Sequence, residues 1–124
     1  MKTDRSREDY LEAILVIEQK RGEVRSVDVA EHLGFSKASV SRAVAQMAAD
    51  GFILFGEDKR IRLTPSGRKT AEQVLEKHRF FKEFLENAGV PEDDAAEQAC
   101  LIEHAVSDES FGKLKETYTN FKTK

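Results

Sequence analysis

The sequence predicts a mainly α-helical protein, in which an N-terminal winged helix-turn-helix is followed by an α-helical dimerisation domain. Apolar residues recur at helical spacing through most of the chain, and capping residues precede these segments. Two short segments between residues 52 and 64 are instead typical of strands. We therefore expect a first part with one β-hairpin, residues 1–67, and an all-helical second part, residues 68–124.

The composition indicates one compact unit or two small subdomains that share a core. The chain has 124 residues, 40% of them hydrophobic, which is too short for several independent domains. No apolar run approaches the roughly 20 residues that span a membrane, and the charged N-terminus lacks the apolar region of a signal peptide. The single cysteine, Cys100, cannot form an internal disulfide, which agrees with a reducing compartment. We expect a cytoplasmic protein with no membrane partner.

The charge is spread unevenly along the chain. A net charge of −3 would ordinarily argue against a nucleic-acid-binding protein. However, residues 1–67 contain 11 Lys and Arg against 11 Asp and Glu, whereas residues 68–124 contain 9 against 12. The whole negative excess lies in the second part, so the first part remains compatible with DNA.

The first part reads as three helices. Ser6 and Asp9 have capping-box spacing and predict a helix over residues 7–20. Ser26 is expected to cap a short helix over residues 27–32, and Ser36 a third helix over residues 37–50. Between the last two, Gly34 provides a residue that tolerates positive φ. This arrangement predicts a helix-turn-helix.

The outward face of the third helix is unusual in its chemistry. It carries hydrogen-bond donors, and residues 34–49 contain no acid. A helix that lies in the major groove of DNA needs such a surface, whereas a merely solvated face would more often include Glu or Asp. We therefore predict a DNA-reading helix. Its candidate contacts are Ser36, Lys37, Ser39, Ser41, Arg42 and Gln46.

A β-hairpin follows, with strands over residues 52–55 and 61–64 and a charged tip between them. The hairpin would form the wing of the domain. Lys59 and Arg60 could reach a phosphate beside the groove, although Glu57 and Asp58 dilute their charge. We therefore expect the wing to be the weaker contact.

Three helices are predicted in the second part. Thr64 and Pro65 open a long helix that ends near Asn87, before Gly89. A helix that starts at Pro91 is expected to run to Ser107, which caps the last helix. The apolar stripe of this last helix is too broad for a lone terminal helix and predicts a second subunit. Its members are Phe111, Leu114, Tyr118 and Phe121.

A possible metal site begins with Cys100, Glu103 and His104, which lie at i, i+3 and i+4 on the helix after Pro91. A divalent ion there needs further nitrogen or oxygen ligands from other helices. Candidates for these are Asp9, Glu12 and His78. The alternative is that these residues bind no metal. Cys100 would then be a buried thiol, Glu103 a solvated carboxylate, His104 a surface histidine and His78 a core histidine. The stretch from residue 99 to 104 favours this alternative when it is considered alone.

Taken together, the motifs resemble the diphtheria toxin repressor and manganese transport regulator family over nearly the whole chain. They are Asp9-Tyr10-Leu11-Glu12, the winged helix-turn-helix, Leu63-Thr64-Pro65-Ser66-Gly67, Lys77-His78-Arg79 and Ile102-Glu103-His104-Ala105-Val106-Ser107. The resemblance implies a homodimeric repressor that binds double-stranded operator DNA when a divalent metal activates it. The family's ligands carry over to Asp9, Glu12, His78, Cys100, Glu103 and His104. With this context, the metal site becomes the preferred interpretation.

The resemblance mixes two branches of the family. Asp9 and Glu12 are similar to the manganese branch, whereas Cys100 is similar to the iron branch. Mn²⁺ or Fe²⁺ is therefore the expected cofactor, with Zn²⁺ and Co²⁺ as further candidates. Lys82 stands where iron-type members place a carboxylate for an ancillary metal, so we expect no such site. The chain ends at Lys124, and we expect no third domain.

Two other classes of function remain as alternatives. One is a winged-helix transcription factor that binds DNA without metal or senses a small organic ligand. The other is a metal-dependent hydrolase, which needs a nucleophile or base and a free coordination position. No residue is left over for those roles, so we expect no enzyme.

Overall fold

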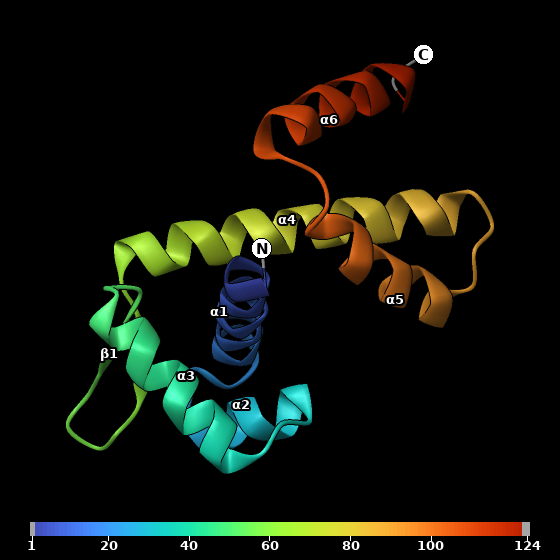
Figure 1. Ribbon diagram of the computed structural model, residues 1–124. Helices are drawn as coiled ribbons and strands as arrows, with labels where there is room; N and C mark the ends of the chain where they lie inside the picture. Colours follow the sequence, from blue (N-terminus) through green and yellow to red (C-terminus); the bar gives the residue numbers. More distant parts are fainter. Residues whose placement is uncertain (1, 123–124) are drawn as a thin grey trace. The chain divides into compact units, whose positions relative to one another are not determined.

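The computed structural model describes residues 2–122 and the side chains of residues 5–121. The described chain is mainly helical with one small sheet, which confirms the predicted fold class (Figure 1). It divides into two compact units, Met1–Gln73 and Val74–Lys124. The elements are α1 (Lys2–Arg21), α2 (Ser26–Leu33), α3 (Lys37–Ala49), β1 (Ile53–Phe55), β2 (Ile61–Leu63), α4 (Pro65–Asn87), α5 (Glu92–Glu103) and α6 (Asp108–Lys122). None of the described helices is both long and apolar enough to cross a membrane.

The first unit is built around α1. One side of this helix is fully buried through Leu11 and Ile14, and α2 and α3 contribute Val29 and Val40 to the same unit. Burial of such side chains stabilises the fold by roughly 1.5–3 kcal/mol each. The helix begins at Lys2, not near residue 7, so the expected capping box is wrong. No proline or glycine interrupts residues 2–6, and Ser6 is tolerated inside the helix.

The helix-turn-helix forms as predicted. Ala30 is buried where α2 meets α3, and Val40 is fully buried on the first turns of α3. Gly34 has a φ of 73°, the left-handed conformation that glycine adopts without strain. Ser36 caps α3 as expected, since its Oγ accepts a hydrogen bond from the Ser39 amide at 3.1 Å. The start of α2 differs by one residue: the N-cap is Arg25, not Ser26.

The hairpin pairs β1 with β2 antiparallel, with Leu54 opposite Arg62. It is tied to α1–α2 because the Ile61 amide donates to the Val24 carbonyl at 2.7 Å. At its end, Thr64 Oγ1 accepts from the Gly67 amide at 3.1 Å and so caps α4. A Cβ on Gly67 would collide with the Phe52 carbonyl oxygen, so the close approach of α4 to the hairpin requires glycine there.

In the second unit, α4 from Val74 onward packs with α5 and α6. Its core cluster joins Phe81, Ala99 and Phe111, one from each helix. Lys77 is almost fully buried and donates to the Val106 carbonyl at 2.9 Å, which fixes the turn between α5 and α6. Ser107 caps α6 as predicted, accepting from the Ser110 amide at 3.1 Å.

The end of α5 differs from the expectation. The helix stops at Glu103 and His104 is its C-cap, so the expected continuation to Ser107 is wrong. A turn forms instead, in which the Ala105 amide donates to the Ile102 carbonyl at 2.9 Å. His104 therefore follows the helix and is not part of its stripe.

Candidate nucleic-acid interface and metal centre

The candidate DNA-reading surface is the exposed side of α3. Lys37, Arg42 and Gln46 are exposed on it, whereas Val44 and Met47 on the opposite side are buried. The amphipathic pattern that places these side chains is the one the sequence predicts. Basic and amide groups on one exposed helix face suit phosphate and base-edge contacts respectively.

The start of α3 has two linked hydroxyls. Ser36 Oγ donates to Ser39 Oγ at 2.9 Å while it accepts from the Ser39 amide. The Ser39 hydroxyl hydrogen is therefore directed elsewhere, and a phosphate oxygen is a suitable acceptor. Both residues sit where the helix dipole favours an anion.

Three small residues on the exposed side of α3 also suit contact with DNA, and the sequence analysis did not include them. Ala38, Ala45 and Ala49 are exposed. Their positions at i, i+7 and i+11 repeat along one side of the helix. Short side chains let a helix approach base edges closely, and a methyl group can contact the methyl of thymine. This spacing is visible in the sequence and indicates that the three alanines share one side of the helix.

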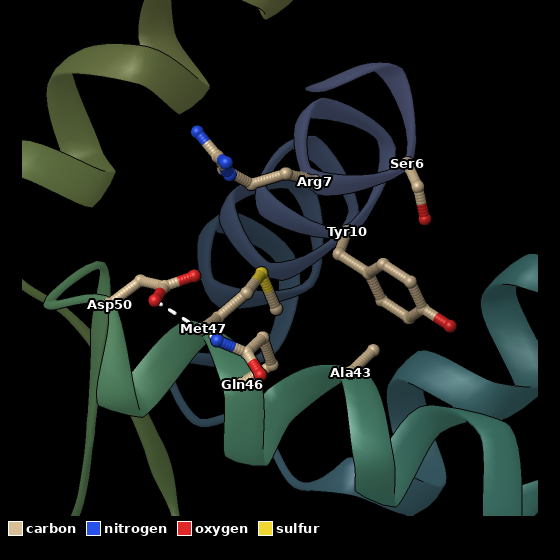
Figure 2. A pocket seen from close by; sticks show the side chains of 7 residues that line it. All are labelled: Ser6, Arg7, Tyr10, Ala43, Gln46, Met47 and Asp50. Carbon is tan, nitrogen blue, oxygen red and sulfur yellow. Dashed lines mark hydrogen bonds between the residues drawn. The ribbon is translucent and has the colours of Figure 1, made fainter. Parts of the chain in front are cut away.

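A concave surface lies beside this face, between α1 and α3 (Figure 2). It encloses about 350 Å³. The Gln46 amide lies at its edge and donates from Nε2 to Asp50 Oδ1 at 3.0 Å (Figure 2). Burial raises the pKa of the nearby Tyr10 hydroxyl, so it stays protonated and can donate a hydrogen bond. The lining residues are Ser6, Arg7, Tyr10, Ala43, Gln46, Met47 and Asp50.

The two basic wing residues differ in their surroundings. Lys59 is exposed at the tip with a φ of 66°. Arg60 forms ion pairs with Glu23 at 2.9 Å and with Asp58 at 2.6 Å. A phosphate would have to compete with these carboxylates for Arg60, so Lys59 is the more accessible of the two cations. Both contacts stay predictions.

Within the second unit, the candidate metal ligands centre on Glu103. This carboxylate is 1% exposed, and its Oε2 is buried without a hydrogen-bond partner among the described residues. Its Oε1 lies 2.8 Å from His78 Nδ1. A carboxylate accepts hydrogen bonds, so the His78 nitrogen is the donor in this contact. The two residues bring a ring nitrogen and a carboxylate oxygen together, as two ligands of one divalent ion would be.

His104 lies close both to the same carboxylate and to Cys100. One His104 ring nitrogen and Cys100 Sγ are within 4.8 Å of each other. His104 Nε2 is also 3.9 Å from Glu103 Oε2. A buried carboxylate oxygen without a hydrogen bond is costly, and a cation is the natural group to offset that cost. The residues present therefore fit a divalent metal ion.

The remaining predicted ligands, Asp9 and Glu12, are half-buried on α1 in the first unit. Their grouping with the ligands of the second unit stays a prediction. Lys82 stands where iron-type members place a carboxylate for their ancillary metal. Its ammonium group is paired with Glu86 at 3.2 Å and with Glu92 at 3.7 Å. The hydrogen bond to Glu86 raises the pKa of Lys82. Its ammonium group stays charged near neutral pH and does not act as a metal ligand.

The second unit also has an apolar groove between α4 and α6, of about 380 Å³. Several of its large side chains remain exposed, most of all Phe121 at 80%. The groove is lined by Phe80, Phe81, Phe84, Leu114, Thr117, Tyr118 and Phe121. Exposed aromatic groups in this number are typical of a protein interface.

Comparison with known proteins agrees with these features. Residues 2–60 match the N-terminal DNA-binding domain of iron-dependent repressors, and residues 64–124 match their metal-binding and dimerisation domain. A transcriptional regulator of the HTH type from Methanocaldococcus jannaschii is 34% identical over 119 residues, covering 94% of this chain and 95% of that protein. The HTH-type transcriptional regulator MntR of Geobacillus kaustophilus is 31% identical over 102 residues, covering 82% of this chain and 72% of that protein.

A solved structure of a manganese-dependent transcriptional repressor in complex with manganese matches with a TM-score of 0.80 and 29% identity. The match covers 90% of this chain and 51% of the other, so the chain spans about half the length of that repressor. Both family matches and both regulators agree with the resemblance drawn from the motifs, which is confirmed. The chain belongs to the iron-dependent repressor family of metal-dependent transcriptional regulators.

Proposed function

We propose that the chain is a transcriptional repressor that binds double-stranded operator DNA as a homodimer when it holds Mn²⁺ or Fe²⁺, and that it controls genes of metal homeostasis. Residues 1–67 would bind the DNA and residues 68–124 would bind metal and dimerise, in a cytoplasm where both DNA and reduced metal are available. The observation that carries the proposal is the buried Oε2 of Glu103, which accepts no hydrogen bond from any residue that the structure describes.

The proposed ligands are Asp9, Glu12, His78, Cys100, Glu103 and His104. Two of them support the proposal through contacts with the Glu103 carboxylate, at 2.8 Å for His78 and 3.9 Å for His104. A bound divalent ion would supply the positive charge that the buried carboxylate lacks. Asp9 and Glu12 lie three residues apart on α1 and so project from one side of that helix.

The donor set suits more than one metal. Three carboxylates are hard ligands that favour manganese, whereas the Cys100 thiolate adds affinity for ferrous iron, cobalt or zinc. More than four donors are available, which suits six-coordinate ions better than tetrahedral zinc. The manganese named for the similar solved structure agrees with this choice.

A link from metal to DNA would run through α1. This helix carries Asp9 and Glu12 and also packs on α2 of the helix-turn-helix. Ligands from both units would restrain the recognition helices of a dimer to spacings near one DNA turn. By linkage, metal raises DNA affinity only as far as it binds the DNA-competent arrangement more tightly than others.

The dimer interface is proposed to include the apolar groove of α4 and α6. Phe84 and Leu114 are each 46% exposed there, and Phe121 is exposed further. A second copy of the same groove would cover them, as a two-fold interface requires.

Direct metal binding tests the proposal. Isothermal titration with Mn²⁺ and Co²⁺ should show at least a tenfold loss of affinity in Glu103→Gln, in line with the loss that such ligand changes cause. Glu97→Gln, an exposed acid on the same helix, is the matched control and should leave affinity unchanged. Equal metal affinity in all three proteins would contradict the proposed site.

DNA binding that is unaffected by metal would favour the alternative of a metal-independent winged-helix factor.

A further inference from the structure

Asp50 stands at a position that neither helix stability nor DNA binding explains. It is the C-cap of α3, where the helix dipole disfavours a negative charge. It also closes a stretch of the chain, residues 34–49, that contains no acid. A carboxylate at the end of a DNA-reading helix repels phosphate. The residue therefore carries two costs, and its side chain accepts a hydrogen bond from Gln46.

The contact with Gln46 fixes the direction of the amide. Gln46 and Asp50 are one turn apart, and Gln46 Nε2 lies 3.0 Å from Asp50 Oδ1, as the dashed line in Figure 2 shows. A carboxylate can only accept hydrogen bonds, so the NH₂ end of the amide must face Asp50. One Nε2 hydrogen is used, and the amide is left with one further hydrogen and with the acceptor Oε1.

This remaining pair matches one purine better than the other. In the major groove, adenine offers one acceptor, N7, and one donor, the N6 amine. Guanine offers two acceptors, N7 and O6, and therefore needs two donors from a side chain. A Gln46 amide without Asp50 could turn its NH₂ group towards guanine. With Asp50 in place, only the donor and acceptor combination of adenine is satisfied.

We infer that Asp50 is a positioning residue that holds the Gln46 amide so that it reads adenine in preference to guanine. This inference rests on the proposed function, because it needs α3 in the major groove. Gln46 is exposed, so its amide is accessible to a base edge. Arg42, one turn earlier on the same face, has the fork of donors that suits guanine, so the two positions would read different bases.

The test is selection of binding sites from randomised double-stranded DNA by the full chain with Mn²⁺. Four variants are compared with the wild type: Gln46→Ala, Asp50→Ala, Asp50→Asn and Glu31→Ala. Glu31→Ala removes an exposed acid from α2 and controls for the loss of one negative charge. Circular dichroism verifies that each variant is folded.

Gln46→Ala should lose the preference at one base pair. Asp50→Ala should change the same base pair and no other, lowering the preference for adenine over guanine from about tenfold to less than about threefold. Asp50→Asn can donate as well as accept, so it no longer fixes the direction of the Gln46 amide and should lower the preference at the same base pair. Glu31→Ala should leave every base preference unchanged.

The inference is overturned if Asp50→Ala selects the wild-type sequence, if it changes all positions equally, or if Asp50→Asn keeps the full wild-type preference. It is also overturned if Gln46→Ala changes no base pair, although DNA binding by the wild type would then still support the proposed function. A wild-type chain that selects no sequence with metal would count against both.

Discussion

At the scale of single residues, the proposed metal binding depends on the group around Glu103. The sequence places Cys100, Glu103 and His104 close together by spacing alone. It could not show that Glu103 would be buried with one oxygen that receives no hydrogen bond in the described part of the chain, because burial depends on packing between helices that are distant in sequence. It also could not place His104 outside α5, because the choice between another helical turn and a tight turn depends on contacts such as that of Lys77 with Val106.

Cys100 should decide which metal is preferred. Cys100→Glu replaces the soft thiolate with a hard carboxylate and should shift relative affinity from Fe²⁺ and Co²⁺ towards Mn²⁺. Competition titrations measure this order. If cysteine is a ligand, cobalt-loaded wild type should also show an intense near-ultraviolet thiolate absorption that Cys100→Ala abolishes. Absence of the band, together with an unchanged order of metals, would mean that the thiol is only a packing group.

Arg42 and Lys37 should have different effects on DNA binding. Arg42→Ala should cost about 1–3 kcal/mol of binding free energy for the preferred sequence and relax that preference. Lys37→Ala should weaken binding to all sequences more evenly and lower its salt dependence. Fluorescence anisotropy on specific and unrelated duplexes at several salt concentrations measures both. If Arg42→Ala retained full affinity and preference, α3 would not be the reading helix.

At the scale of elements, the periodicity and capping residues located every helix and both strands. The prediction succeeded best for α3 and α4, where Ser36 and Thr64 make local hydrogen bonds that depend on nearby sequence alone. It was less accurate for the start of α1, since Ser6 has a strong preference for caps but is also tolerated within helices. The start of α1 and the end of α5 differ from the predictions, because the residues near them in sequence do not specify where these helices begin and end.

The junction of the hairpin with α4 should depend on Gly67. Gly67→Ala places a methyl group against the Phe52 carbonyl, and relieving that overlap should cost about 1–3 kcal/mol of unfolding free energy. Urea denaturation followed by circular dichroism measures it. Gly112→Ala, within α6, is the matched control, since its added methyl group meets no atom within 4 Å apart from the neighbouring backbone of its own helix, and it should be neutral or stabilising. Equal stability of the two variants would show that α4 can move away from the hairpin.

At the scale of the whole molecule, the chain divides into two units within one long helix, α4. The first unit contains the proposed groove-reading helix, and the second contains a buried carboxylate beside two histidines. The change in charge and motifs along the chain predicts a division after residue 67. The sequence predicted the need for a second copy through the aromatic stripe of α6, but it could not show that α4 contributes Phe80 and Phe84 to the same groove.

Dimer formation should be sensitive to Phe121. Its side chain is 80% exposed in one protomer, so Phe121→Lys should not disturb the fold but should shift the protein towards monomer. Light scattering over a range of concentrations measures the change, with Thr119→Lys on α6 as the control outside the groove. A dimer that is equally stable in both variants would place the interface on another surface.

The most direct test of metal-dependent repression is the affinity of the chain for its selected DNA duplex with and without metal. Fluorescence anisotropy should show tighter binding with Mn²⁺ than in EDTA by roughly 5–150-fold, the usual range of such coupling. Glu103→Gln should bind DNA in both conditions with the weak affinity of the metal-free wild type. Equal affinity of the wild type with Mn²⁺ and in EDTA would contradict the account.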